Sequence, residues 1–351
     1  MRVLQVLGTT DADDDADASL DLHRGLAHLG VEVRTLALAP GRTAGFQTEI
    51  PTMGPSVRSL AAVTQLRREQ RWADVVVLRG EAPVAAAGWL PARGAPPTVL
   101  QLGCDAWDGK GARVPTRVRR LAQRGIRVVV PHRSARWVGP VLGITSDRVE
   151  VIACGVDVGG VVPLDGSARR CAARGVLGVP EEARVALVLG DDDAALDVAA
   201  EAGRLGMVVL SERAAGIGGR CDDELVTFGA EGHHVDAGAR RELVTSASDL
   251  VIAPGVARDV SPRLLRAAGV GLAVVATGGE AMSELVDDTT GWSSIGEAAS
   301  VDDAELRRRG RGAAARVAER FALDDVARRW ASLLASVRGP GPVPSTRPDG
   351  P

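Results

Sequence analysis

Residues 251–292 read VIAPGVARDVSPRLLRAAGVGLAVVATGGEAMSELVDDTTGW, and this stretch decides the fold. An apolar run over residues 250–253 ends at Pro254, and a loop leads to a short helix predicted over residues 262–268. A second apolar run follows over residues 272–276. Strand, loop, helix and strand in this order form the repeating unit of a parallel sheet. Ligands bind outside the carboxyl ends of such strands, so the loop after Pro254 is the first place to seek a site.

The same alternation runs through the rest of the chain in two series. Residues 2–152 alternate apolar runs with helical stripes, and residues 183–337 do so again. The Gly- and Val-rich segment 155–164 between them predicts a linker. We therefore expect an α/β protein of two Rossmann-like, doubly wound domains that face each other across a cleft. The predicted parts are a first domain over residues 1–156, a second domain with a closing C-terminal helix over residues 157–337, and a disordered Pro/Gly tail over residues 338–351.

Two local predictions bear on the cleft. Residues 9–17 are acidic and rich in alanine, and we expect a loop there before a helix over residues 19–29. Residues 225–228 form a further predicted strand of the second domain, which ends at Gly229. The carboxyl end of such a strand would add Gly229 to the edge of the second sheet.

Composition indicates an ordinary globular chain. Of the 351 residues, 45% are hydrophobic and 25% are charged. No run of about 18 apolar residues occurs, and the formal net charge of −3 argues against a nucleic-acid partner. The start, MRVLQVLG, has no basic leader or cleavage site, so we expect a cytoplasmic protein. Its widely spaced cysteines are expected to be reduced: Cys104, Cys154, Cys171 and Cys221.

Five segments, taken in order, carry a family resemblance. They are VLQVLGTTDADDDADASLDLHRGLAHLGVEVRTLALAPG at residues 3–41, RVEVIACGVDVGGVVP at 148–163, ARGVLGVPEEARVALVLG at 173–190, VATGGEAMSELVDDTTGW at 275–292 and AERFALDDVARRWASLL at 318–334. Together they resemble the retaining glycosyltransferases of family 4, which have the GT-B fold. The resemblance implies transfer of a sugar from a nucleotide-sugar, held by the second domain, to an acceptor held by the first. It implies no metal cofactor, because helix N-termini and basic side chains can hold the diphosphate.

The resemblance also implies a set of donor contacts in the second domain. Where the family has two glutamates in its donor loop, this chain has Arg258 and Arg266. Arginine cannot accept hydrogen bonds as a carboxylate does, but its guanidinium binds phosphate well. One of these two arginines is therefore expected near the diphosphate. The other implied donor contacts are Gly190, Gly229, Gly255, Thr277 and Glu284.

Several positions depart from the family pattern. Three aspartates at positions 191–193 stand where the family has an Arg and a Lys beside the diphosphate. The acidic segment 9–17 replaces its glycine-rich loop, and a histidine of the family falls at about Gly103. Two hypotheses follow. The protein is a glycosyltransferase with rearranged donor recognition, or it is a catalytically impaired pseudo-glycosyltransferase that binds a ligand or a partner enzyme.

Candidates on the acceptor side come from the residues themselves. Trp107 follows the fourth strand together with Asp105, and a tryptophan beside a carboxylate suits sugar stacking and hydroxyl binding as well as simple packing. His132 follows a strand end and is either an acid/base group or a structural residue. Asp105 and His132 are the candidate catalytic residues. The arginine-rich segment 113–124 is either a solvated face or a surface for an anionic acceptor or a membrane.

Acidic pairs at DxD spacing raise the question of a metal. Such pairs can hold a divalent cation against a diphosphate, but in an aspartate-rich chain a solvated loop is the favoured interpretation. We therefore expect no metal site at the pairs Asp11/Asp13, Asp13/Asp15, Asp15/Asp17 and Asp191/Asp193.

Overall fold

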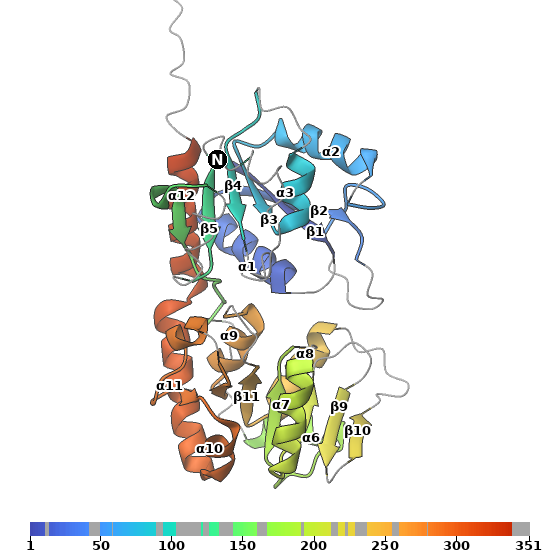
Figure 1. Ribbon diagram of the computed structural model, residues 1–351, viewed down its shortest axis with the longest axis vertical. Coiled ribbons are helices and arrows are strands. Elements are labelled where there is room, and N and C mark those ends of the chain that lie inside the picture. The colour runs from blue at the N-terminus through green and yellow to red at the C-terminus, as the bar shows by residue number, and fades with distance from the viewer. Residues whose placement is uncertain are drawn as a thin grey trace, which may run out of the picture.

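The computed structural model describes residues 1–10, 14–41, 50–57, 59–88, 94–102, 121, 126–132, 143–159, 167–190, 193–211, 217–221, 224–228, 237–254, 260–278 and 280–338. Two parallel sheets, each packed with helices on both faces, form two lobes stacked along the long axis (Figure 1). The predicted fold class is confirmed. In the part of the chain that is described, no helix is long and apolar enough to cross a membrane.

The first lobe contains a sheet of six parallel strands. In spatial order they are β2 (Glu32–Ala39), β1 (Arg2–Thr9), β3 (Val75–Arg79), β4 (Thr98–Gln101), β5 (Arg127–Val130) and β6 (Val149–Val151). Successive side chains of a strand point to opposite faces, so Leu78 packs on one face and Val77 on the other. The described helices are α1 (Asp14–His28), α2 (Leu60–Gln70), α3 (Glu81–Ala87) and the short η3 (Ser146–Arg148).

The second lobe contains a sheet of five parallel strands. In spatial order they are β13 (Gly291–Trp292), β12 (Ala273–Ala276), β11 (Leu250–Ala253), β7 (Val185–Val188) and β8 (Val208–Ser211). Buried apolar side chains cover both faces, as expected of a parallel sheet. The helices are α6 (Ser167–Leu177), α7 (Asp193–Arg204), α8 (Ala237–Ala247), α9 (Pro262–Gly269), η4 (Glu280–Glu284), α10 (Ile295–Ser300) and α11 (Asp303–Arg320).

The stretch that decides the fold forms β11, α9, β12 and η4, with the strands and helix as predicted. The start of α9 has a clear local cause. The Ser261 hydroxyl accepts a hydrogen bond from the Leu264 amide at 3.2 Å, and Pro262 stands at the first helical position. Both features favour a helix N-terminus, because they satisfy or remove amide groups that have no partner within the helix.

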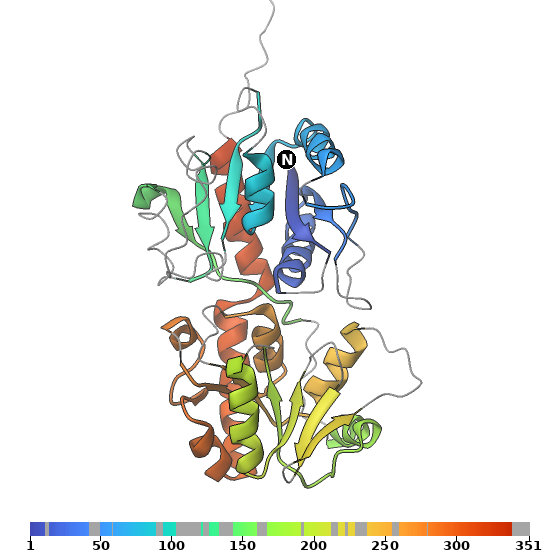
Figure 2. The same ribbon diagram turned by 45° about the vertical axis from the view of Figure 1, so that its right-hand side comes forward.

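The last helix, α12 (Leu323–Arg338), crosses back to the first lobe (Figures 1 and 2). Its Trp330 is buried against the face of the first sheet that also packs α1. Gly25 of α1 allows the close approach, because a Cβ there would lie 2.8 Å from the Ala327 Cβ. The chain passes between the lobes at Val156 and again at Phe321, and the Val156 amide donates to the Phe321 carbonyl at 2.9 Å. The two crossings are thus hydrogen-bonded to each other.

One of the two local predictions is wrong, and the other is confirmed as a strand but not as a member of the five-stranded sheet. Helix α1 begins at Asp14, so residues 14–17, predicted as loop, belong to its first turns. Strand β10 (Glu224–Phe228) pairs only with β9 (Ile217–Cys221), in an antiparallel ladder outside the five-stranded sheet. An apolar run of β-branched residues predicts a strand, but it does not identify the partner strand. The basis for adding Gly229 to the edge of the second sheet is therefore lost.

Some predictions fall outside the described residues. These include most of the arginine-rich segment 113–124 and nearly all of the predicted tail 338–351. Of the cysteines, Cys154 and Cys171 are not part of a disulfide.

Candidate functional site

The carboxyl edge of the second sheet faces the first lobe. Gly190 follows β7 and has a φ of 97°, which is accessible to glycine at little cost and lets the chain turn after the strand. Thr277 follows β12, and its amide donates to the Ala253 carbonyl at the end of β11, at 3.2 Å. Two of the predicted donor contacts therefore lie at this edge. Helix α9, which comes after β11, contacts α1 of the first lobe (Figure 1).

A cluster of charged side chains joins the two lobes at this contact. One Arg266 amino group, Nη1, lies 2.9 Å from Asp17 Oδ2, and the other, Nη2, lies 2.6 Å from Asp21 Oδ2. Arg241 of α8 reaches the same Asp17 oxygen at 2.9 Å. Arg24 lies 2.8 Å from the second oxygen of Asp21. Arginines of α8 and α9 in the second lobe thus bind two carboxylates on one face of α1.

The two carboxylates of the cluster are shielded from water, whereas Arg266 is 36% exposed and Arg24 is 57% exposed. The Asp21 side chain is only 3% exposed, and burial raises its pKa against the opposing effect of Arg266 and Arg24. Burial also opposes the charge on Arg266, but the carboxylates of Asp21 and Asp17 outweigh it, so the pKa of the guanidinium is raised. Removing one partner of such a cluster would leave an uncompensated charge in a poorly hydrated place, which is strongly unfavourable.

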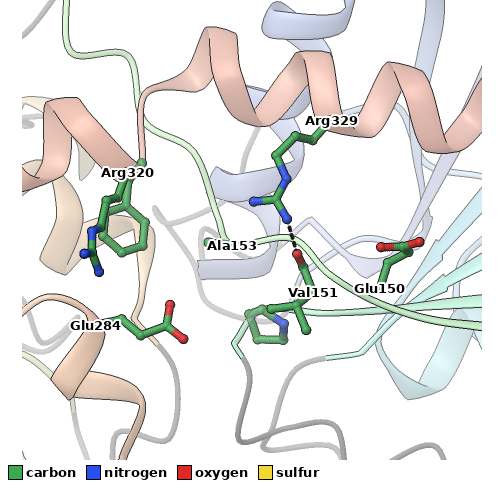
Figure 3. A pocket seen from close by; sticks show the side chains of 8 residues that line it. Glu150, Val151, Ala153, Glu284, Arg320 and Arg329 are labelled. Carbon is green, nitrogen blue, oxygen red and sulfur yellow. Dashed lines mark hydrogen bonds between the residues drawn. The ribbon is translucent and has the colours of Figure 1, made fainter. Parts of the chain in front are cut away.

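A cavity of about 340 Å³ lies beside the two chain crossings (Figure 3). Glu284 of η4 and Arg320, at the end of α11, line it from the second lobe. Glu150 lines it from β6, and Arg329 of α12 donates a hydrogen bond to the Val151 carbonyl. Glu284, a predicted donor contact, therefore lines an interlobe cavity with charged residues of both signs.

His132 is buried and immediately follows Pro131, which lines the same cavity. This candidate from the first lobe and Glu284 from the second therefore belong to one region of the cleft. The other predicted site residues lie outside the described part of the chain: Asp105, Trp107, Gly229, Gly255 and Arg258. Among the described residues, no group of three or more His, Cys, Asp or Glu side chains is arranged to hold a metal ion.

The first sheet ends in buried polar side chains beneath α1. Arg79, the last residue of β3, donates to the Ser19 hydroxyl of α1 at 2.7 Å. Its register partner on β4 is Gln101. The Gln101 Oε1 atom and the Gln5 Nε2 atom are buried and have no hydrogen-bond partner in the protein as described. Such atoms are places where an ordered water or a polar ligand group gains a hydrogen bond.

The residues of the ion cluster were not identified from sequence. The sequence predicts that Asp17 lies in a solvated acidic loop, whereas in the structure it is buried and bound to two arginines. A signal was nevertheless present. The chain has excess negative charge in its first βα segment and arginine where the resembling family has donor-loop carboxylates. The first domain thus has added negative charge and the second domain added positive charge on opposite sides of one predicted cleft. This pattern indicates that the two sets of charges pair across the cleft.

No protein-family model matches the sequence, and no curated protein was found to match it. Solved structures with the same architecture do match. HepE of Anabaena, in complex with UDP and glucose, superposes on 96% of this chain and 100% of its own, with a TM-score of 0.73 and 15% identity. Sucrose-phosphate synthase from Thermosynechococcus elongatus covers 95% of this chain and 98% of its own, with a TM-score of 0.66 and 14% identity.

A third match, an α-glucosyltransferase in complex with UDP, covers 95% of this chain and 99% of its own, with a TM-score of 0.64 and 11% identity. Each of these likenesses extends over both lobes and nearly the whole chain. The protein therefore has the two-lobed GT-B fold of these glycosyltransferases.

Proposed function

We propose that the protein transfers a sugar from a nucleotide-sugar donor to an acceptor. The observation that carries the proposal is the arrangement of two Rossmann-like lobes around one cleft, shared over 96% of the chain with a structure that contains UDP and glucose. Ligands of open parallel sheets bind outside the carboxyl ends of the strands, and here those ends border the cleft. The segments quoted above add support for a retaining, family 4 type of transferase.

The donor is proposed to bind the second lobe. Gly190 and Thr277 lie at the carboxyl edge of its sheet, and Glu284 lines the adjoining cavity. The family resemblance alone adds Gly229 and Gly255 to the proposed nucleotide contacts, with Arg258 or Arg266 near the diphosphate. An arginine there would stabilise the negative charge that develops on the leaving diphosphate. No metal cofactor is needed in this proposal, because guanidinium groups supply the positive charge.

The acceptor is proposed to bind the first lobe. Asp105, Trp107 and His132 follow its fourth and fifth strands, and Asp105 and His132 remain the proposed catalytic residues. The buried polar group around Arg79 and Gln101 ends the neighbouring strands, so it belongs to the same edge. We extend the proposal to a peripheral contact between the arginine-rich segment 113–124 and an anionic acceptor or membrane surface.

Calorimetric titration with UDP, GDP and their common sugar conjugates tests the proposal. We expect one nucleotide series to bind with a one-to-one stoichiometry and without added Mn²⁺. Incubation of the bound sugar conjugate with candidate acceptors should then release the nucleoside diphosphate. Absence of binding to every nucleotide and conjugate, with and without Mn²⁺, would sink the proposed function. Binding only with Mn²⁺ would contradict the metal-free donor site.

One observation favours a second candidate, a pseudo-glycosyltransferase that binds a ligand or a partner enzyme without transfer. Arg266, one of the two proposed phosphate-binding arginines, is already bound to Asp17 and Asp21. In a protein without transfer activity this ion cluster would serve only to hold the lobes together. Nucleotide binding without release of the sugar, across acceptors of varied chemistry, would favour this candidate over the transferase.

A further inference from the structure

Two guanidinium groups of the second lobe converge on a single oxygen atom. Arg241 Nη1 and Arg266 Nη1 each lie 2.9 Å from Oδ2 of Asp17. The two arginines come from different helices, α8 and α9, while the oxygen comes from α1 of the other lobe. A carboxylate oxygen held by two arginines has the charge and hydrogen-bond geometry of a bound phosphate oxygen.

The two aspartates are not equivalent. The Asp21 side chain is 3% exposed and is held by Arg266 at 2.6 Å and Arg24 at 2.8 Å. Asp17 is 11% exposed and is bound through Oδ2. If Asp17 moves away, Arg266 keeps its contact with Asp21 through Nη2, and its Nη1 still points to where Asp17 Oδ2 was. Asp21 therefore fixes the guanidinium in place, and Asp17 is the exchangeable partner.

The charge of the cluster also favours an external anion. Three arginines, at positions 24, 241 and 266, face two aspartates among the described residues. Release of Asp17 would take one negative charge away from the two guanidinium groups that are directed at its Oδ2 position. A doubly charged phosphate group balances this charge better than the single carboxylate does.

We propose that Arg241 and Arg266 form an oxyanion site for a phosphate group, and that the Asp17 carboxylate occupies it until a phosphate-bearing ligand displaces it. The proposal rests on the proposed function for the identity of that ligand, the diphosphate of the nucleotide-sugar. The exchange has a structural consequence. Because Asp17 belongs to α1, its displacement removes part of the contact between the lobes and couples ligand binding to their separation.

The carboxylate of Asp17 sets the expected strength of binding. A phosphate group must displace this carboxylate from Arg241 and Arg266 before it can bind. We therefore expect the affinity of the unaltered protein to be low and to fall with added salt. Neutralising Asp17 should then increase the affinity, which is the reverse of what loss of an ordinary contact residue does.

Calorimetric titration with inorganic pyrophosphate tests the proposal, with UDP titrated in parallel. We expect Asp17→Asn to bind pyrophosphate about tenfold more tightly than the unaltered protein, and Arg241→Gln to bind it at least about tenfold more weakly. Arg307→Gln is the matched control, because it removes one arginine from the exposed surface of α11 and should leave the affinity unchanged. Circular dichroism confirms that each variant is folded, and Arg241→Lys replaces Arg241→Gln if the latter is not.

The outcomes separate this proposal from the proposed function. UDP binding that is unaffected by Asp17→Asn and Arg241→Gln would overturn the oxyanion site and leave the transferase proposal standing. Pyrophosphate binding with the expected pattern, but no binding of any nucleotide, would support the oxyanion site and overturn the proposed function. Equal weakening by Arg307→Gln would show nonspecific attraction to arginine and overturn the site. No binding of pyrophosphate or UDP to any variant would also overturn the oxyanion site, and it would overturn the proposed function as well if GDP and the sugar conjugates fail to bind.

Discussion

Arg174 is a buried arginine whose guanidinium binds several backbone and side-chain groups of the second lobe. Its Nε atom donates to the Ala247 carbonyl at 3.0 Å, and its Nη2 lies 2.6 Å from a carboxylate oxygen of Asp249. Its Nη1 donates to the Ala183 carbonyl at 2.8 Å and also to the Glu181 carbonyl. One guanidinium thus joins α6 to the end of α8 and to the entries of β7 and β11. The fixed fork of five N–H donors makes arginine suited to this position.

Replacing Arg174 by methionine should lower the free energy of unfolding of the second lobe by about 3 kcal/mol, the lower end for breaking a buried ion pair. The lower end applies because Asp249 keeps Arg170 at 2.9 Å and the Val185 amide at 2.8 Å. Arg169→Met is the control on the same helix, since its partner Glu242 is 67% exposed and such pairs contribute little. Urea denaturation followed by circular dichroism measures both, and equal losses would contradict the assignment.

Asp287 gives a pH-dependent contribution to stability. The Thr289 hydroxyl at 2.6 Å is the main cause that lowers its pKa far below the usual range, with further contributions from the Thr289 amide at 2.8 Å and from Arg316. A carboxyl with a lowered pKa in the folded state stabilises the protein above its unfolded pKa of about 4. This stabilisation is lost as the pH falls below about 4 toward the folded value.

Asp287→Asn should therefore reduce the free energy of unfolding at neutral pH and have a smaller effect in acid. We expect a loss of about 1 kcal/mol near pH 7, because the side chain is 42% exposed and water screens its charge. Urea denaturation of both proteins between about pH 7 and about pH 3 measures the difference. A difference that is constant across this range would show that the carboxyl charge is not the cause.

Single residues also show how far the sequence could identify the site. The family resemblance implies that Gly190, Thr277 and Glu284 are donor contacts, and the structure has the first two at strand ends and Glu284 in the interlobe cavity. The partners of Arg266 could not be found in this way. Asp17 and Asp21 lie 249 and 245 positions away, and only the packing of two lobes brings them together.

At the scale of elements, short sequence patterns predict the helices and strands whose formation depends on neighbouring residues. The run LVIA, the Ser261 cap with Pro262, and the run AVVA each specify one element of the deciding stretch. Helix α6, with the sequence SARRCAARGVL, lies between the predicted linker and the first predicted strand of the second domain, where no element is predicted. Nothing in the sequence of α12 alone shows that it packs on the first lobe. Pairing and packing depend on distant elements, which a local pattern does not contain.

Two glycines in helices should respond in opposite ways to alanine. A Cβ on Gly310 of α11 would lie 1.9 Å from the backbone carbonyl oxygen of Gly271, at the turn before β12. Because backbone cannot move aside cheaply, Gly310→Ala should destabilise the second lobe by about 1–3 kcal/mol. Gly175 of α6 has no atom within 4 Å of its Cβ position, so Gly175→Ala should stabilise by up to about 1 kcal/mol. Thermal melting compares them, and a stabilising Gly310→Ala would contradict the close packing of α11.

At the scale of the whole molecule, two kinds of contact set the relation between the lobes. The chain crossings at Val156 and Phe321 are joined by backbone hydrogen bonds, and α12 is anchored on the first lobe by Trp330. These contacts lie along one side of the molecule (Figure 1), and we expect them to act as a hinge. The ion cluster between α1 and α9 forms a separate contact, without covalent continuity. Apolar packing at the hinge is not weakened by salt, whereas added salt weakens the ion pairs of the cluster.

Loss of the Arg266 guanidinium should therefore let the lobes separate while the hinge remains intact. Arg266→Gln removes the contacts with Asp17 and Asp21 together, and we expect a larger radius of gyration in small-angle X-ray scattering. Salt at about 1 M, where the Debye length is about 3 Å, should move the unaltered protein toward the variant. Arg184→Gln is the control, because its ion pair with Asp303 lies within the second lobe and its loss should leave the radius unchanged. Identical scattering from Arg266→Gln and the unaltered protein at low salt would mean that Arg266 is not needed to hold the lobes together, and that the hinge and the remaining Arg241–Asp17 pair are sufficient.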